Sequence, residues 1–585
     1  NALGQGGVSS LSARIDGTFG NPIYFAAYML FHVFIAALLW VQQWSERKKG
    51  ERLALSIAYG TIIAIDTLAL LFTGTRGTML GLAGGAFLTA VLVLLQSRNS
   101  RLAWRISAIT VAVLVLLAAG IWAVKDTTFA RKVVFVDRLS TISLEDATVK
   151  ARFINWSIAW QGVKERPILG WGQENYAIVF DKYYDPRMYA QEPWFDRVHN
   201  IVFDWLVAGG FLGLISYLSI FVAALWALWR HGFTVAERSL LTGLLAAYFC
   251  HNFFVFDNVT SYILFATILA YIVYRRGAAT EAKPLFERMA VPRTLLPYVA
   301  LAFALITWGV AYGVNGPALA QNQALLQALA PHQEGVTKNL QYFKEAIAIH
   351  SYGTQEAREQ LSQGTMQIIR STSMSDAQKQ PFYDLAISEM RAQAKESQLD
   401  ARFPLFLGLL YDAAGDRVNA GLALTKAQEL TPKKQGVFFE LARQAQLRGD
   451  TSAAIEYYKT AYELEMNYRD ARFYYAAALI AAGRDTEAGV LLAPLLASGE
   501  AADTRILAAY VERKEYTKAA VLWRAKIAAN ASDMQAYFTL AAIYYEGGDR
   551  ESAIAALEDA KRVSPAIRLQ ADALIQQIRA GTAQR

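Results

Sequence analysis

Long apolar segments dominate the first half of this sequence. Eight of them lie at about residues 23–43, 54–73, 78–96, 104–124, 206–229, 239–256, 260–274 and 294–314. About 20 mostly apolar residues are enough for a helix to cross a membrane. The segments therefore predict a transmembrane helical bundle over residues 23–314. Asp257 and Asn258 interrupt one long apolar stretch, and we expect a tight turn at the membrane surface there.

The basic residues of the short loops predict the orientation of this bundle, because such loops are enriched in Lys and Arg on the cytoplasmic side. One set of alternate loops carries Arg47, Lys48, Lys49, Arg52, Arg98, Arg101, Arg105, Arg230, Arg238, Arg275, Arg276, Lys283, Arg288 and Arg293. The short loops of the opposite set carry only Arg14 and Arg76. We therefore expect loop 1–22, the long loop 125–200 and the C-terminal region to lie outside the cytoplasm.

The chain begins with Asn1 in a polar loop, so we expect it to be a fragment that lacks upstream membrane helices. The single cysteine, Cys250, excludes a disulfide framework and a cysteine-based zinc site. The net charge of +7 is modest, and no basic run with interleaved aromatic residues indicates nucleic-acid binding.

The C-terminal region contains a repeat with a period near 34 residues. Gly415-Asp416, Gly449-Asp450, Gly483-Arg484 and Gly548-Asp549 mark equivalent turns, and Lys514-Glu515 occupies the remaining one. This spacing is typical of tetratricopeptide-like helix pairs. We therefore predict an all-α chain, in which an α-solenoid at 396–585 follows the membrane bundle and residues 315–395 form a helical stalk or degenerate repeats. Stacked repeats form a concave groove, so we expect a protein partner there.

The sequence has no Walker loop, no dinucleotide-binding fingerprint and no His-Glu-x-x-His motif. Polar residues on the predicted outer side are the remaining candidates for chemistry. Arg76 lies between two membrane helices, where an arginine faces a cavity or partner or else extends to the lipid headgroups. Arg152 begins an amphipathic segment that ends at Val163 and suits the membrane surface; alternatively, Arg152 is a solvated or lipid-contacting charge.

His199-Asn200 stands where the long loop re-enters the membrane. A histidine there can act as a base or can be a hydrogen-bonded loop residue. The preceding run Tyr176–Trp194 suits a lid, a sugar-binding surface or an interfacial anchor. For His251-Asn252 we favour helix packing through buried hydrogen bonds, and for His32 we also favour packing.

Several of these segments, in this order, resemble the O-antigen ligase family, whose organisation O-antigen polymerases share. The matching segments are Arg14-x-x-Gly17-Thr18-Phe19-Gly20-Asn21-Pro22, Thr75-Arg76-Gly77, Arg152-x-x-x-Trp156, Pro167-Ile168-Leu169-Gly170-Trp171-Gly172 and His199-Asn200 before a glycine-rich helix start. The resemblance covers about residues 10–275.

The resemblance implies a metal-independent enzyme of the bacterial cytoplasmic (inner) membrane that uses no cofactor. It would transfer a glycan from undecaprenyl diphosphate to a lipid or protein acceptor outside the cytoplasm. Arg76 and Arg152 correspond to the arginines that bind the diphosphate, and His199 corresponds to the essential histidine. Arg14 and Asn200 are possible further site residues.

Two alternatives remain open. A polymerase would need the same arginines, and the large repeat region favours ligation only slightly. A membrane-anchored repeat scaffold would instead leave Arg76, Arg152 and His199 dispensable.

Overall fold

The computed structural model describes residues 14–97, 100–141, 143, 145–191, 194–230, 232–280 and 291–582. Its described elements are all helices, as the sequence predicts. The chain divides into two compact units. The first comprises residues 1–183 and 191–303, and the second comprises residues 184–190 and 304–585. The boundary at 303/304 falls inside helix α12 (Leu296–Leu329), which continues beyond the predicted span 294–314.

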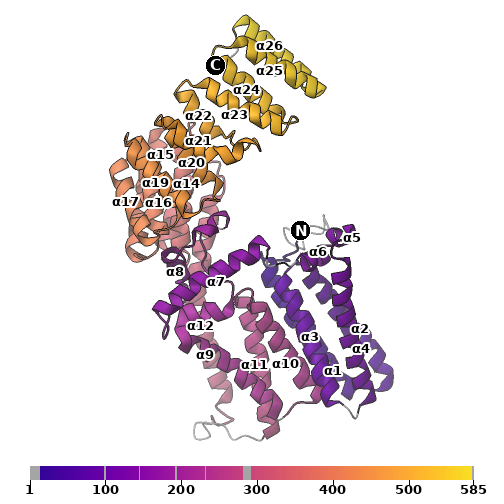
Figure 1. The fold of residues 1–585 in the computed structure, drawn as a ribbon. Helices are drawn as coiled ribbons and strands as arrows, with labels where there is room; N and C mark the ends of the chain where they lie inside the picture. Colours follow the sequence, from indigo (N-terminus) through magenta and orange to yellow (C-terminus); the bar gives the residue numbers. More distant parts are fainter. Residues whose placement is uncertain are drawn as a thin grey trace. The chain divides into compact units, whose positions relative to one another are not determined.

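The first unit is built from long apolar helices that lie along one another (Figure 1). These are α1 (Pro22–Glu46), α2 (Lys49–Phe72), α3 (Arg76–Gln96), α4 (Arg101–Val124), α9 (Ile201–Arg230), α10 (Val235–Asn252) and α11 (Val259–Thr280), followed by the start of α12. The first helix begins sharply because the Asn21 side chain accepts a hydrogen bond from the Ile23 amide and Pro22 occupies the first helical position.

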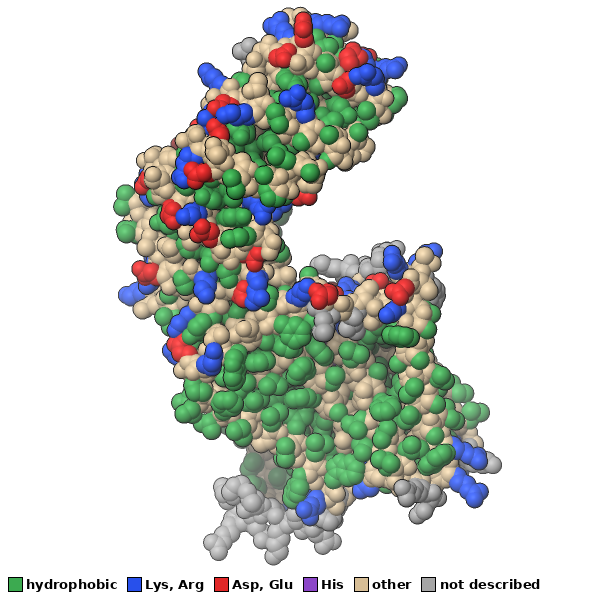
Figure 2. All heavy atoms as spheres, in the orientation of Figure 1, with side chains coloured by type: hydrophobic (Ala, Val, Ile, Leu, Met, Phe, Trp, Pro, Cys, Tyr) green, Lys and Arg blue, Asp and Glu red, His purple; other side chains and the backbone are tan. Residues whose placement is uncertain are grey.

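Six of these helices, α1–α4, α9 and α12, are long and apolar enough to cross a membrane. The predicted spans at 239–256 and 260–274 also form helices, α10 and α11, separated by the expected non-helical segment at Asp257-Asn258. Figure 2 shows hydrophobic side chains over much of the visible face of the first unit, with charged side chains near the ends of its helices. The protein is therefore a membrane protein.

Small residues allow the central pair of helices, α3 and α10, to pack closely. A Cβ atom added at Gly81 would lie 2.7 Å from the Ala247 carbonyl oxygen, and one at Gly85 would lie 2.5 Å from that of Gly243. Close backbone approach through small residues is a common way for membrane helices to associate. Beside this contact, Phe31 of α1 and Tyr248 of α10 pack with a ring separation of 5.0 Å in the apolar core.

The long loop after α4 is largely helical. It contains α5 (Thr128–Lys132), α6 (Val134–Ser140), α7 (Ala147–Glu165), α8 (Tyr176–Lys182) and the 3-10 helix η1 (Pro186–Ala190). The predicted amphipathic segment lies within α7, which buries Ile158 and Val163 and exposes Phe153 and Trp160. The loop thus presents one long helix beside the membrane bundle.

The segment Pro167–Gly172 packs against a break in the backbone of α9. Gly210 has φ 62° and ψ −161°, which interrupts the helix. The Phe211 amide, freed by this break, donates to the Pro167 carbonyl at 2.7 Å, and the Trp171 amide donates to the Val207 carbonyl at 2.7 Å. A Cβ atom at Gly210 would come within 2.3 Å of Ile168. The loop after α7 therefore completes the hydrogen bonding of the broken helix, and this fixes the start of α9.

The second unit is a series of antiparallel helix pairs. Its helices after α12 are α13 (Val336–Ala348), α14 (Thr354–Arg370), α15 (Asp376–Glu396), α16 (Arg402–Ala413), α17 (Arg417–Leu430), α18 (Gln435–Leu447), α19 (Thr451–Leu464), α20 (Arg469–Ala481), α21 (Asp485–Leu496), α22 (Thr504–Glu512), α23 (Tyr516–Ala529), α24 (Met534–Glu546), α25 (Arg550–Val563), η3 (Pro565–Ile567) and α26 (Arg568–Ala580).

The predicted turns separate the two helices of successive pairs from α16/α17 to α24/α25. Gly449 has φ 76°, and the Asp450 side chain then caps α19. Lys514 adopts φ 59° at the turn that has no glycine, which confirms that it is equivalent to the others. Helices α16–α26 of this unit form the tetratricopeptide-like solenoid that the 34-residue period predicts. The region 315–395, predicted as a helical stalk or degenerate repeats, is helical and contains the end of α12 followed by α13, α14 and α15.

Candidate active site

Arg76 binds the loop segment before α7 through three groups. Its Nη1 donates to the Asp146 carboxylate at 3.0 Å, Nη2 donates to the Thr141 hydroxyl at 3.0 Å, and Nε donates to the Arg138 carbonyl oxygen at 2.8 Å. A guanidinium has five N–H donors, so two remain for a ligand. Arg76 is thus a structural link to residues 138–146 that keeps some capacity for an anion.

Asp146 connects Arg76 to the helix that carries Arg152. One of its oxygens caps α7 by accepting hydrogen bonds from the Thr148 amide at 2.8 Å and the Thr148 hydroxyl at 2.6 Å. These hydrogen bonds, together with Arg76, lower the pKa of Asp146 to about 2, so it is ionised near neutral pH. Arg152 follows within two helical turns. The carboxylate of Asp146 therefore links Arg76 to the helix that carries Arg152.

Arg152 has no hydrogen bond or ion pair with any described residue, although its side chain is half-buried. Burial lowers its pKa, and the nearby charge of Arg76 lowers it further. Arginine nevertheless stays protonated in proteins. A partly desolvated cation without an anion is unfavourable, and Arg152 is therefore suited to bind an anionic ligand.

Two further arginines lie close to one another at the same end of the bundle. Arg14 donates from Nε to the Thr73 carbonyl at 2.7 Å and from Nη2 to the Thr75 hydroxyl at 3.2 Å. Burial lowers its pKa, and the charge of Arg138 on α6 adds to that shift. Of Arg14, Arg76, Arg138 and Arg152, only Arg76 forms an ion pair within the described part of the chain. The cluster carries a clear excess of positive charge.

His199 lies near Arg152 in a strained backbone conformation. Its φ is 59°, which is uncommon outside glycine. The half-buried ring lies between Phe195 and Phe256, at centroid distances of 5.8 and 5.3 Å. Burial, and then the charge of Arg152, lower the pKa of His199 to about 4, although Asp204 opposes the shift. The imidazole is therefore neutral at pH 7 and able to accept a proton.

The residues next to His199 in the chain stabilise the local backbone and the start of α9. Asn200 caps α9, because its side-chain oxygen accepts hydrogen bonds from the amides of Val202 at 2.9 Å and Phe203 at 3.2 Å. The guanidinium of Arg197 binds both carboxylate oxygens of Asp204, the closest contact being 2.6 Å. Arg197 is thereby neutralised, and the positions of Asn200 and Arg197 favour structural roles.

The other histidines singled out from the sequence lie in packed helices. His251 is fully buried, and its Nδ1 lies 2.7 Å from the Thr78 hydroxyl, which confirms the expected packing of α10 against α3. Asn252 donates to the Asp257 carboxylate at 2.5 Å. The ring of His32 packs on Tyr28 at 4.1 Å.

The aromatic run Tyr176–Trp194 is divided between the two units. Helix α8 belongs to the first unit, where the Tyr176 hydroxyl bonds to Asn155. Residues 184–190 belong to the second unit, where the Tyr189 ring stacks on Tyr468 at 4.3 Å and the Gln435 amide donates to the Pro186 carbonyl at 3.0 Å. Part of this run thus packs on the repeats.

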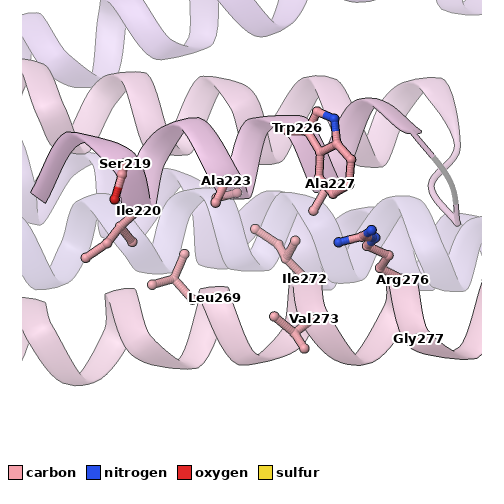
Figure 3. Close-up of a pocket in the computed structure, with 11 residues that line it drawn as sticks. Ser219, Ile220, Ala223, Trp226, Ala227, Leu269, Ile272, Val273, Arg276 and Gly277 are labelled. Carbon is pink, nitrogen blue, oxygen red and sulfur yellow. The ribbon is translucent and has the colours of Figure 1, made fainter. Parts of the chain in front are cut away.

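A groove of about 660 Å³ lies between α9 and α11, and its lining includes none of these polar groups (Figure 3). Apolar side chains, such as Ile220 and Ile272, line most of it. At one end the Arg276 guanidinium lies over the Trp226 ring, 4.2 Å from its centroid. It contains none of the predicted site residues.

Sequence reasoning missed Arg138, Asp146 and Asn155. An aspartate before an amphipathic helix is a recognisable cap, and Asn155 is three residues after Arg152, on the same helical face. The position of Arg138 depends on the path of the loop, which no local pattern reveals.

No curated protein matches this chain. Among solved structures, it is similar to YrrB, a TPR protein with an unusual peptide-binding site, with a TM-score of 0.22, 16% identity and coverage of 30% of this chain and 92% of YrrB. MamA gives a TM-score of 0.21 and 17% identity over 33% of this chain and 96% of MamA. The TPR domain of P58(IPK) gives 0.16 and 17% over 56% and 94%.

The O-Antigen ligase family profile (Wzy_C) matches residues 60–218. The matched region includes Arg76, Arg138, Asp146, Arg152 and His199, whereas Arg14 precedes it. This chain is thus a membrane protein in which a region that matches the O-antigen ligase family, residues 60–218, is followed by tetratricopeptide-like repeats.

Proposed function

We propose that this protein transfers a glycan from undecaprenyl diphosphate to an acceptor hydroxyl on the outer side of the bacterial cytoplasmic membrane. The observation that carries the proposal is the half-buried guanidinium of Arg152, which has no hydrogen bond or ion pair to a described residue, beside Arg76 and the neutral ring of His199. All three residues lie in the region matched by the O-antigen ligase family, which supports a glycosyltransferase-type reaction.

The arginines would bind the diphosphate of the donor. Arg152 offers its whole guanidinium, and Arg76 offers the two N–H groups that its links to residues 138–146 leave unused. Guanidinium groups form bidentate, charge-assisted hydrogen bonds with phosphate oxygens. They would bind the donor and stabilise the negative charge that develops on the leaving diphosphate. Arg14 and Arg138 would add favourable potential to the site.

His199 would act as the general base. As the bond between the sugar anomeric carbon and the diphosphate oxygen breaks, the acceptor oxygen forms a new bond to that carbon. The hydroxyl proton passes to the neutral imidazole, and undecaprenyl diphosphate leaves with the electrons of the broken bond. The low pKa of His199, about 4, keeps the ring unprotonated before the step.

The repeat unit would serve the acceptor side of the reaction. Stacked helix pairs present surfaces that suit protein ligands, so the acceptor or an assembly partner would be a protein bound there. The basic clusters in alternate short loops support an orientation in which this unit would lie outside the cytoplasm. A lipid acceptor would leave the chemistry at Arg152 and His199 unchanged.

Glycan transfer from a lipid diphosphate donor, measured in membranes at matched expression, tests the proposal. We expect Arg152→Ala and His199→Ala each to lower transfer by about 100-fold or more. Arg131→Ala is the control, because Arg131 is exposed in the same loop and should transfer normally. Normal transfer by the two site variants would contradict the proposal. A long glycan polymer that remains linked to the lipid would instead indicate a polymerase.

A further inference from the structure

We propose that Asn155 is a positioning residue for His199: its side-chain amide holds the two peptide groups before the histidine and so sets the direction of the imidazole. This inference rests on the proposed function for its catalytic meaning. Its structural basis is independent of that function, since it depends on contacts between α7, α8 and the segment that leads into α9.

The amide of Asn155 holds the backbone directly before His199. Its Nδ2 donates to the Val198 carbonyl at 2.9 Å and lies 3.5 Å from the Arg197 carbonyl. Asn155 is only 1% exposed, and Val198 is fully buried. A buried amide with a fixed partner restricts the backbone far more than an exposed one, because water cannot replace the lost hydrogen bond.

Tyr176 of α8 fixes the orientation of that amide. Its hydroxyl bonds to the side-chain oxygen of Asn155 and lies 3.1 Å from the Asn155 carbonyl oxygen. Tyr176 is 3% exposed, and burial raises its pKa well above the usual value, so the hydroxyl keeps its proton and remains a donor. The amide of Asn155 must therefore present its NH₂ group to the backbone before His199.

The other side of the same segment is held by Asp204. One of its carboxylate oxygens accepts a hydrogen bond from the Val198 amide at 3.4 Å, and Arg197 binds the same carboxylate. After His199, Asn200 caps α9. The left-handed backbone of His199 thus lies between two fixed segments. Strained conformations persist only where the surroundings impose them, and they are common at functional sites.

Asn155 also belongs to the helix that carries Arg152. The two residues are three apart on α7, so their side chains project from one face. The same helix is capped by Asp146, which binds Arg76. We infer that α7 sets the distance between the anion-binding arginines and His199. Asp146, which caps this helix, binds Arg76, and Asn155 on the helix binds the backbone before His199.

The charged and titratable groups around His199 define the pH readout. Arg152 on α7 and Arg197 lower its pKa, and Asp204 on α9 raises it. The phenol groups of Tyr176 on α8 and Tyr262 on α11 interact with Asp204. A carboxylate at position 155 would add negative charge close to the imidazole and raise the pKa of His199.

The test is the rate at which diethyl pyrocarbonate modifies His199, measured against pH by mass spectrometry on the full chain in detergent. Only a neutral imidazole reacts, so the profile reports the pKa of His199 without requiring transfer activity. We expect Asn155→Asp to shift this profile to higher pH and Asn155→Ala to increase the rate several-fold. The peptide that carries the exposed His350 serves as the internal reference.

Transfer kinetics form the second readout. We expect Asn155→Ala to lower kcat by about 10- to 100-fold with little change in the donor KM, because a displaced base affects the chemical step rather than donor binding. Tyr176→Phe should act in the same direction but less strongly. Gln321→Leu is the matched control, since the Gln321 amide is also buried and binds backbone groups, but in the second unit.

The outcomes separate the two proposals. If Asn155→Ala and Gln321→Leu both lower thermal stability, while the profile and kcat of Asn155→Ala stay at wild-type values, Asn155 has only a structural role and the inference is wrong. If the wild-type chain shows no transfer but Asn155→Ala increases the modification rate of His199 as expected, the positioning of His199 stands and the proposed function fails.

Discussion

Arg76 and Arg152 carry the same charge in one cluster but differ in their partners. Arg76 pairs with Asp146 and binds two further loop groups, whereas Arg152 has no such bond to the described residues. Removing a paired cation leaves its anion without a partner, while removing an unpaired one relieves desolvation. We therefore expect a substitution of Arg76 to lower both stability and function, and a substitution of Arg152 to lower function without lowering stability.

Thermal unfolding in detergent should show this difference. We expect Arg76→Gln to lower the free energy of unfolding by about 1–3 kcal/mol, since three hydrogen bonds and a partly exposed ion pair are lost. Arg152→Gln should leave the melting temperature unchanged or raise it, although transfer is lost. A similar decrease in both variants would show that Arg152 has an internal partner in solution.

The pH dependence of transfer should reflect His199. Its pKa is lowered to about 4, so the free enzyme loses its base only when the pH falls toward that value. A bound diphosphate brings negative charge near the ring and raises the pKa of His199. We therefore expect kcat/KM to remain constant down to about pH 5 and kcat to decline at a higher pH than kcat/KM.

Initial rates over a donor concentration series at each pH will measure the acidic decline, or limb, of the pH profiles of kcat and of kcat/KM. Coincident limbs for kcat and kcat/KM would contradict a base beside the diphosphate. A kcat/KM limb close to the ordinary histidine value would show that the ring is more solvated than its contacts with Phe195 and Phe256 imply.

The candidate residues could be found in the sequence, but their partners could not. Arg76, Arg152 and His199 stand out because they are polar residues at the ends of apolar segments. The pairing of Arg76 with Asp146, 70 positions later, requires the loop to fold back on the α2–α3 turn. The neutrality of His199 depends on burial between two aromatic rings, which no local pattern contains.

At the scale of elements, the broken helix α9 is the feature that the apolar pattern did not predict. The apolar run indicates one span from about residue 206, whereas the structure begins the helix at Ile201 and interrupts it at Gly210. The glycines could indicate a helix start, but the break requires the backbone partners Pro167 and Val207. By contrast, the period near 34 was sufficient to place the repeat turns, including the one at Lys514.

Replacing Gly210 should disturb the start of α9. Gly210→Ala combines a positive φ with a Cβ contact of 2.3 Å to backbone atoms, so we expect a loss of about 3 kcal/mol or more and lower activity. Gly209→Ala is the control, because nothing lies within 4 Å of its added Cβ. Thermal unfolding that shows equal stability for the two variants would contradict the break at Gly210.

At the scale of the whole molecule, two units share one chain, and the loop around the candidate site contributes to both. Residues 184–190 pack within the repeat unit, while the flanking residues belong to the membrane unit. The sequence predicted the two kinds of architecture from hydropathy and from the repeat period. It could not predict that residues 184–190 belong to the second unit. Nothing in the run Tyr176–Trp194 distinguishes a residue that packs on repeats from one at a membrane surface.

The orientation of the chain should follow its basic loops. A periplasmic-type reporter, such as alkaline phosphatase, fused after Arg585 should be active, and a fusion in the short loop near Arg47–Lys49 should be inactive. The second fusion is the control for expression. Activity only in the short-loop fusion would place Arg76, Arg152 and His199 on the cytoplasmic side and would refute an outer-side transferase.

Arg152, which has no hydrogen bond or ion pair within the described part of the chain, is proposed to bind a lipid-linked diphosphate. Equilibrium binding of undecaprenyl diphosphate to the detergent-solubilised full chain tests it most directly, with Arg152→Gln compared with Arg131→Gln. We expect the Kd of Arg152→Gln to rise by about 10- to 100-fold, as for a lost charge-assisted contact, and that of Arg131→Gln to match wild type. Equal affinity in all three proteins would contradict the account.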